Sequence, residues 1–231
     1  MGPAPSSGRE LWAPRTGSGQ DGVMTDWHVW YGQYDEEDSS LSRRLRVVQQ
    51  RLDDLVGGEP PVRRVLSLCA GDGRDILPVV ARLPNARRPE LHLVEIDPAL
   101  AAAAERRAVD VGVAATVVVG DAGLAKTWQN VGPVDLLMLC GIFGNISETD
   151  IRTTISASRG VLNHGGSVIW TRGRFAAGPD LRPQIRAWFR EAGFTETAFD
   201  SEPTGYGVGV NRVTSHLPPT PVPDRLFAFL R

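Results

Sequence analysis

Apolar segments of strand length alternate with segments of helical periodicity from residue 65 to residue 213, and this alternation limits the fold more than any other feature. Strands are expected at 65–70, 91–95, 115–119, 134–140 and 166–171, and helices at 73–83, 98–109, 148–162 and 180–192. Continuous apolar strands separated by helices predict a parallel sheet that is buried on both faces. Two further strands, about 195–200 and 205–213, have a short connection and predict an antiparallel strand near the C-terminus. The expected fold class is α/β, a seven-stranded, mostly parallel, doubly wound sheet.

The chain is expected to form one domain preceded by a tail. Residues 1–23 are rich in Gly, Pro and Ser, which predicts disorder. The single domain is expected over residues 24–231. Within it we expect an N-terminal helical lid (24–60), a core (62–213) and a C-terminal extension (214–231).

Composition narrows the classes of partner. The formal net charge is −2 and the pI about 6.1, whereas nucleic acid and anionic lipid call for a strongly basic face. No apolar run approaches the roughly 18 residues of a membrane span. The two cysteines, Cys69 and Cys140, have no metal-binding spacing, so no metal is expected and a reduced cytoplasmic location fits.

A glycine turn and a strand-end carboxylate point to a nucleoside cofactor. The first strand ends at Gly71-Asp72-Gly73, where backbone without Cβ atoms permits close approach of a ligand. The second strand ends at Glu95, which is placed to accept hydrogen bonds from both hydroxyls of a ribose. The two features together predict an adenosine-containing cofactor.

One candidate cofactor is NAD, whose binding turn has the pattern G-x-G-x-x-G. Gly71 and Gly73 match the first two glycines, but Ile76 stands at the third position. The acid at Asp121, directly after the third strand, also has no counterpart in NAD binding. An NAD-dependent oxidoreductase is therefore the weaker alternative.

The order of these motifs resembles that of the class I S-adenosylmethionine-dependent methyltransferases, over residues from about 40 to 213. The four matching segments are Leu68–Gly73, Val94–Asp97, Gly120–Ala122 and Asp135–Gly141. The late strand Tyr206–Val213 is similar to the seventh strand of that family. The resemblance implies a Rossmann-like methyltransferase fold and S-adenosylmethionine as cofactor, with S-adenosylhomocysteine as product.

The resemblance also implies roles for particular residues. Glu95 would hold the ribose hydroxyls, Asp121 would accept from the adenine amino group, and the end of the fourth strand would face the sulfonium and the incoming substrate. The implied cofactor contacts are Cys69, Ala70, Gly71, Asp72, Gly73, Glu95, Ile96, Asp121, Ala122, Cys140 and Gly141.

The first motif departs from the family at two positions. Ser67 stands where the family has an acid, and Cys69 stands where it has a glycine. Ser67 cannot supply a charge to the ammonium group of the cofactor, so the methionine end needs another partner. Asp72 and Asp75 are the candidates.

The expected acceptor is a small molecule, with an anionic one as an option. The sequence Cys140-Gly141-Ile142-Phe143 replaces the Asn/Asp-Pro-Pro-Tyr/Phe motif that is typical of amino-methylating nucleic-acid and glutamine enzymes. Arg172 and Arg174 follow the fifth strand and suit a carboxylate or phosphate, although a solvated surface pair is the slightly favoured alternative. Asn145 is expected either to contact the substrate or to cap its turn.

An aromatic face precedes the core. It consists of Trp27, Trp30, Tyr31 and Tyr34 at helical spacing, and Tyr31 and Tyr34 are candidate substrate contacts from a lid. His28 beside them and Asn145 are the weak catalytic candidates, and no other catalytic residue is identified. The alternative to an enzyme is a non-catalytic S-adenosylmethionine-binding scaffold. The oligomeric state is left open.

Overall fold

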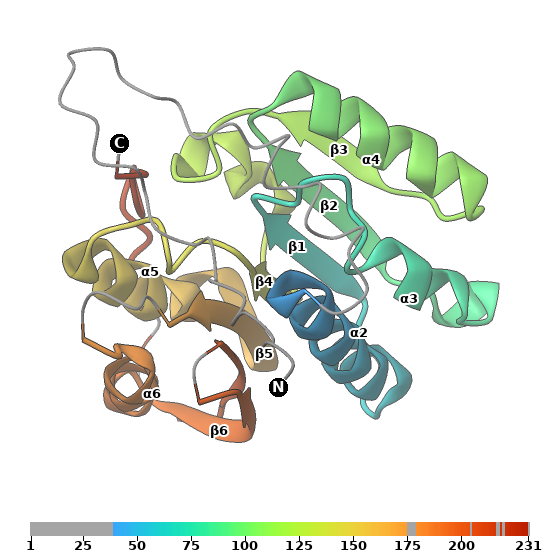
Figure 1. Ribbon diagram of the computed structural model, residues 1–231. Coiled ribbons are helices and arrows are strands. Elements are labelled where there is room, and N and C mark those ends of the chain that lie inside the picture. The colour runs from blue at the N-terminus through green and yellow to red at the C-terminus, as the bar shows by residue number, and fades with distance from the viewer. Residues whose placement is uncertain (1–38, 175–178, 204, 216–217, 219, 231) are drawn as a thin grey trace, which may run out of the picture.

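The computed structural model describes residues 39–174, 179–203, 205–215, 218 and 220–230. Seven strands occur in this part of the chain: β1 Arg64–Leu68, β2 Glu90–Glu95, β3 Thr116–Val119, β4 Val134–Leu139, β5 Leu162–Gly173, β6 Phe194–Ser201 and β7 Tyr206–Val213. They form one sheet in the order β3-β2-β1-β4-β5-β7-β6 (Figure 1). Strand β7 is antiparallel to its neighbours β5 and β6, and the other pairings are parallel. The predicted fold class, with its antiparallel strand near the C-terminus, is confirmed.

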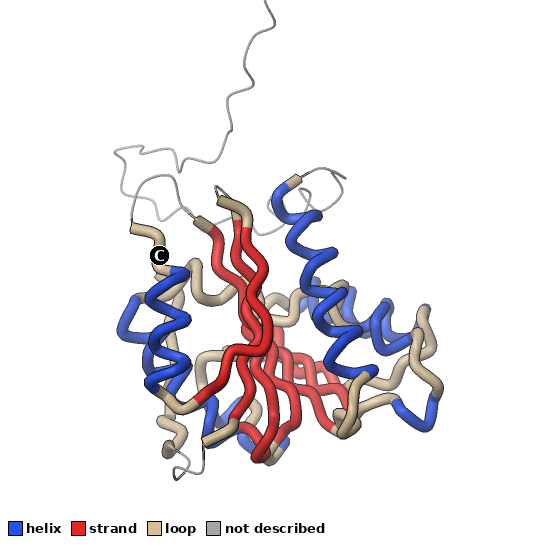
Figure 2. Tube along the Cα trace, turned by 90° about the horizontal axis from the view of Figure 1, so that it is seen from below, coloured by secondary structure: helices blue, strands red, loops and turns tan. Residues whose placement is uncertain are grey.

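Helices cover both faces of the sheet, which Figure 2 shows in another orientation. The helices are α2 Ser40–Gly57, α3 Leu77–Ala81, α4 Pro98–Asp110, α5 Glu148–Val161 and α6 Arg182–Glu191, with short 3-10 turns at Asn85–Arg87, Ala125–Thr127 and Gln129–Val131. One apolar cluster joins α2, α3 and α4 to one face, and a second joins α5 and α6 to the other. Strand β1 serves both clusters, because Val65 belongs to the first, and Leu66 and Leu68 belong to the second. Burial on both faces explains why this strand reads as a continuous apolar run.

Helix α2 is held at the end of the sheet that carries β7 and β6. Ser39 caps it by accepting a hydrogen bond from the amide of Ser42 at 3.0 Å. Arg51 then forms a two-pronged ion pair with Asp200 of β6, at 2.7 and 2.8 Å. Arg43 in the first turn pairs with Glu202 at 2.8 Å, and Gln49 donates to the carbonyl of Arg74 at 2.8 Å, so α2 also lies against the loop after β1.

Two predicted boundaries were wrong by more than two residues. The helix expected from residue 73 begins only at Leu77, because residues 71–76 form turns in which Gly71 and Gly73 have positive φ. Strand β5 begins at Leu162 and not at 166, because Leu162 already pairs with Val134 across an irregularity in the register. Gly165 and Gly166 lie inside this strand.

Both cysteines are free, and they follow the neighbouring strands β1 and β4. No helix among the described residues is both long and apolar enough to cross a lipid bilayer.

Gly209 generates a test of the core. It pairs with Trp170 across β5 and β7, and a Cβ atom at residue 209 would overlap the indole. That indole is fully buried, stacks on Phe189 with ring centroids 5.8 Å apart, and donates to Asn211 at 2.8 Å. We expect Gly209→Ala to lower the free energy of unfolding by about 1–3 kcal/mol, measured by urea denaturation.

Gly57→Ala is the matched control, because a Cβ atom there meets nothing within 4 Å in the last turn of α2. It should leave stability unchanged or raise it by up to about 1 kcal/mol. Equal effects of the two substitutions would contradict the packing described for Trp170.

Candidate functional site

Glu95 connects the first two strand ends. The residue is 7% exposed; Oε2 of its carboxylate accepts from the amide of Gly71 at 2.8 Å and Oε1 accepts from the amide of Asp97 at 2.9 Å. Each carboxylate oxygen can accept about two hydrogen bonds, so each retains an acceptor position. The carboxylate therefore fixes the loop after β1 against the end of β2 and can still accept from two hydroxyls.

Asp121 joins the same place from β3. The amide of Gly120 donates to the carbonyl of Glu95 at 2.9 Å, which sets the next residue, Asp121, beside the end of β2. Burial raises the pKa of the Cys69 thiol well above its ordinary value, and the charges of Glu95 and Asp121 raise it further. The structure thus brings Gly71, Glu95 and Asp121 together at one part of the carboxyl edge.

The loop after β1 has the left-handed backbone conformation typical of glycine at residues 69, 71 and 73, although residue 69 is a cysteine. Cys69 has φ +57°, Gly71 +58° and Gly73 +69°, and Cys69 is the one non-glycine residue with positive φ in the described chain. A left-handed residue with a Cβ atom costs roughly 1–2 kcal/mol. Cysteine in place of glycine at residue 69 therefore lowers the stability of this turn but does not change its backbone conformation.

Asp72 has structural partners. Its carboxylate receives hydrogen bonds from Arg74 at 2.8 Å and from Arg107 of α4 at 2.6 Å, and the residue is 4% exposed. Burial opposes ionisation, but the two guanidinium groups outweigh it and hold the pKa of Asp72 below its ordinary value. This carboxylate fixes α4 to the loop after β1.

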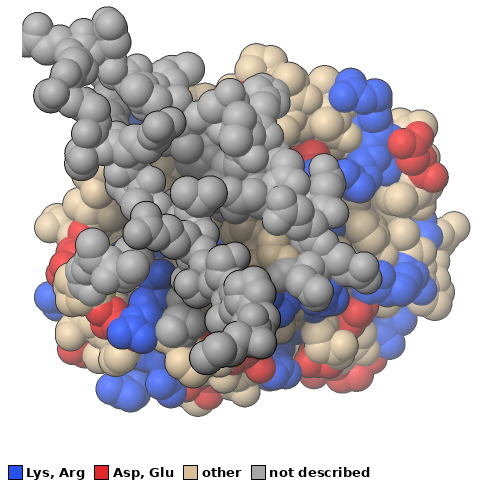
Figure 3. All heavy atoms as spheres, in the orientation of Figure 1, with Lys and Arg blue, Asp and Glu red and all other residues tan. Residues whose placement is uncertain are grey.

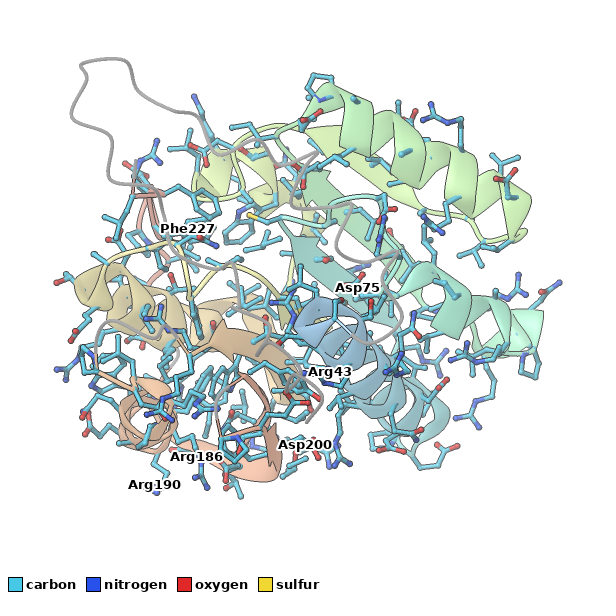
Figure 4. All side chains as sticks on the ribbon, viewed as in Figure 1. Arg43, Asp75, Arg186, Arg190, Asp200 and Phe227 are labelled. Carbon is cyan, nitrogen blue, oxygen red and sulfur yellow. The ribbon has the colours of Figure 1, made fainter. Side chains whose placement is uncertain are left out.

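Asp75 has a different environment. One carboxylate oxygen accepts from the amide of Ile76 at 2.9 Å. Burial raises the pKa of Asp75 to about 6, with a smaller effect in the same direction from Asp72 and an opposing one from Arg44. Burial also raises the pKa of Cys140, and Asp75 adds to that rise. The charges of Asp75 and Arg44 thus act on the thiol at the end of β4, which places the three groups in one region of the site; Figure 4 labels Asp75.

The turn after β4 carries the next predicted contacts. The amide of Gly141 donates to the hydroxyl of Thr171 at 2.8 Å, and the side-chain amide of Asn145 donates to the carbonyl of Gly141 at 2.7 Å. Of the two roles expected for Asn145, this contact is the turn-capping one. The turn is therefore a fixed platform at the end of β4.

Arg172 and Arg174 do not form a matched pair of open guanidinium groups. Arg172 is 9% exposed and donates to the carbonyl of Phe143, and burial lowers its pKa despite the charges of Glu148 and Asp180. Arg174 donates to the carbonyl of Pro203 at 2.7 Å. Both side chains hold backbone segments around the site.

Of the remaining predicted contact residues, some are buried, one is exposed, and three lie outside the part of the chain that the structure describes. Ala70 and Ala122 are buried, whereas Ile96, directly after Glu95, is 61% exposed. Val119, which pairs with Glu95 across β2 and β3, is 57% exposed, so apolar surface remains open beside Glu95. His28, Tyr31 and Tyr34 lie outside the described residues.

Two surface hollows in the described part of the chain lie away from this edge. One of about 500 Å³ is lined by residues of α5 and α6 and by Pro221, and one of about 250 Å³ includes Asp135 and His164 near the opposite edge of the sheet. Among the described residues, no group of three His, Cys, Asp or Glu side chains is arranged to hold a metal ion.

Sequence reasoning missed three residues of this region: Arg44, Thr171 and Arg225. Arg225 donates to Asp121 at 3.1 Å although 104 residues separate them. Neither periodicity nor a motif marks any of the three. Only the placement of Thr171 at the end of a predicted strand, next to Arg172, gave a signal that could have been used.

No protein-family model and no curated protein matches the sequence. Solved structures do match in fold. A magnesium protoporphyrin IX methyltransferase from Synechocystis, with bound S-adenosylmethionine, has 16% identity and a TM-score of 0.59 over 82% of this chain and 92% of that one. A TehB-like S-adenosylmethionine-dependent methyltransferase from Corynebacterium glutamicum has 15% identity and a TM-score of 0.55 over 80% and 95%.

An O-methyltransferase family protein from Burkholderia thailandensis has 18% identity and a TM-score of 0.58 over 74% of this chain, which spans 57% of that protein's length. Together with the strand order, these likenesses establish that the chain has the fold of the class I S-adenosylmethionine-dependent methyltransferases.

Cys69 tests the backbone of the first loop. Cys69→Val places a β-branched residue at positive φ and should lower the free energy of unfolding by about 2 kcal/mol. Cys69→Gly relieves the strain but removes the thiol and loosens the unfolded chain, so it should change stability by less than about 1 kcal/mol. Urea denaturation measures both, and a valine variant as stable as the glycine variant would contradict the left-handed conformation.

Proposed function

We propose that this protein is an S-adenosylmethionine-dependent methyltransferase that acts on a small molecule. The observation that carries the proposal is the carboxylate of Glu95, which binds the amide of Gly71 and keeps acceptor capacity beside Asp121. The shared fold supports the same reading, and two of the matching structures are described with S-adenosylmethionine bound.

The residues at the carboxyl edge fit the adenosyl part of this cofactor. Glu95 has one open acceptor position on each oxygen, which matches the two hydroxyls of a ribose. Asp121 offers an acceptor for the adenine amino group, and the exposed side chains of Ile96 and Val119 offer apolar surface for the purine. Oxidoreductase chemistry with NAD has less support, because Ile76 at the third glycine position is fully buried in the core.

Asp75 is our candidate for the ammonium group at the methionine end. Ser67 carries no charge, and the carboxylate of Asp72 is engaged by two arginines. Asp75 lies beside Cys140 at the end of β4, where the reacting group of the cofactor would lie. Arg44, which is close enough to lower the pKa of Asp75, suits the carboxylate of the same amino-acid moiety.

The proposed chemistry needs alignment more than a reactive side chain. When bound, S-adenosylmethionine supplies an electrophilic methyl group that is transferred by in-line displacement. Glu95, Asp121 and Asp75 would hold the two ends of the cofactor, while the Gly141 turn, fixed by Thr171, would form the floor beside the methyl group. Fixed geometry and exclusion of water then supply most of the rate enhancement.

A small acceptor agrees with the charge of the protein. Basic and acidic side chains are interspersed on the visible part of the face in Figure 3, and the net charge is −2. Arg172 is buried and donates to the carbonyl of Phe143, whereas Arg174 is exposed and uses one of its five N–H donors on the carbonyl of Pro203, so an anionic acceptor stays a prediction.

Ligand-induced stabilisation tests cofactor binding. We expect S-adenosylhomocysteine at about a hundredfold excess over its Kd to raise the Tm by roughly 5 °C or more, and NAD to leave it unchanged. Glu95→Ala should abolish the shift because the ribose loses its acceptor. Glu90→Ala removes an exposed carboxylate at the other end of β2 and should preserve the shift.

A full shift in the Glu95 variant would overturn the ribose assignment. Turnover separates an enzyme from a binding scaffold: labelled methyl groups should pass from S-adenosylmethionine to a component of a small-metabolite extract. Binding without any such transfer would favour the scaffold.

The pH dependence of binding tests Asp75. Because its pKa is about 6, the carboxylate becomes protonated as the pH falls through 6, and the ammonium group then loses its partner. The affinity for S-adenosylhomocysteine should be about tenfold weaker at pH 5 than at pH 7, measured by calorimetry. Asp75→Asn should bind weakly at pH 7 and lose this pH dependence.

The same substitution should act on stability with the opposite sign. The folded-state pKa lies above the ordinary 3.8, so ionisation of Asp75 costs stability as the pH rises from about 4 to above 6. Asp75→Asn should therefore stabilise the free protein at pH 7.5, by up to about 2 kcal/mol. Asp53→Asn, at an exposed carboxylate of α2 paired with Arg82, is the control and should alter neither property. A pH profile unchanged in Asp75→Asn would contradict the assignment.

A further inference from the structure

A segment near the C-terminus joins two loops of the proposed cofactor site. Residues 224–230, which we call the C-terminal strap, run beside α5 in Figure 1. On one side, the amide of Ala125 donates to the carbonyl of Asp224 at 2.9 Å, and the amide of Leu226 donates to the carbonyl of Gly123 at 2.8 Å. On the other side, the amide of Leu230 donates to the carbonyl of Asn145 at 2.8 Å. The strap thus binds the loop after β3 and the loop after β4 at once.

Apolar burial and a close approach anchor the strap. Leu226 and Phe227 are each 1% exposed and belong to the cluster that includes Ala122 and Phe143; Phe227 is labelled in Figure 4. Gly123 lies so close that a Cβ atom there would overlap the carbonyl oxygen of Phe227. The hydroxyl of Thr154 in α5 also donates to the carbonyl of Leu226 at 3.3 Å. The strap is therefore packed into the hydrophobic core beside the proposed site.

One side chain of the strap reaches the acid assigned to adenine. The guanidinium of Arg225 donates to Oδ2 of Asp121 at 3.1 Å, while Oδ1 accepts from the amide of Gly123 at 2.8 Å. Two donors thus fix the plane of the carboxylate, and two of its roughly four acceptor positions remain open. A donor from a ligand can still bind without displacing Arg225.

We propose that Arg225 is a positioning residue for purine recognition: it orients Asp121 so that the acid accepts from a 6-amino group and rejects a 6-carbonyl group. The inference rests on the proposed function and adds a selectivity to it. A ligand carbonyl directed at an ionised carboxylate lacks a donor, so a fixed and charged Asp121 discriminates adenine from hypoxanthine. A mobile Asp121 could turn away and would discriminate less.

The test compares S-adenosylhomocysteine with S-inosylhomocysteine, in which a carbonyl replaces the adenine amino group. Calorimetry on the full chain gives the two Kd values and their ratio. The unmodified chain should prefer the adenosyl ligand by about tenfold or more. Arg225→Ala should reduce this preference severalfold, and Arg225→Lys should restore part of it by keeping the charge. Arg152→Ala, at an exposed arginine paired with Glu191 at 3.5 Å, is the control and should keep the original ratio.

A double-mutant cycle separates positioning from general loosening of the fold. Asp121→Asn alone should reduce the preference, and Arg225→Ala added to it should reduce it no further, because Arg225 acts through Asp121. Losses that multiply, or an unchanged ratio in Arg225→Ala, would overturn the inference. Equal binding of both ligands by the unmodified chain would overturn it and leave the proposed function standing. No binding of either ligand by the unmodified chain would overturn the proposed function as well.

Discussion

The carboxylate of Glu95, shared between the amides of Gly71 and Asp97, is the interaction on which this site depends. It joins the loop after β1 to the end of β2 at 2.8 and 2.9 Å, in a position that is almost closed to solvent. A buried carboxylate without donors would be costly, so the two amides stabilise the acid as much as the acid fixes them. The same geometry leaves acceptor positions open toward a ligand.

Charge pairs within the protein decide which acids remain for binding. Asp72, directly after Gly71, is engaged by Arg74 and Arg107 and fixes α4 in place. Asp75, three residues further along, accepts from the amide of Ile76, and burial raises its pKa to about 6. Two acids of one short loop therefore differ in their partners: guanidinium groups bind the carboxylate of Asp72 directly, whereas Arg44 acts on Asp75 through its charge, and we assign the binding role to Asp75.

The sheet, and the convergence of its strand ends at one edge, could be predicted from the sequence. The contacts between segments that are distant in the chain could not. Apolar runs at β1, β2 and β4 are long enough to identify, and a parallel sheet necessarily places their carboxyl ends at one edge. The left-handed conformation at Cys69 departs from the usual preference for glycine. The pairing of Asp121 with Arg225 spans 104 residues and has no local pattern, so only the folded chain could reveal it.

The central claim is that three strand ends meet around one adenosyl group. A crystal structure of the protein with S-adenosylhomocysteine tests it most directly. Both ribose hydroxyls are expected within hydrogen-bonding distance of Glu95, and the adenine amino group at Asp121. Density for the ligand elsewhere, for example in the hollow beside Trp188 and Pro221, with Glu95 and Asp121 not in contact with it, would contradict the account.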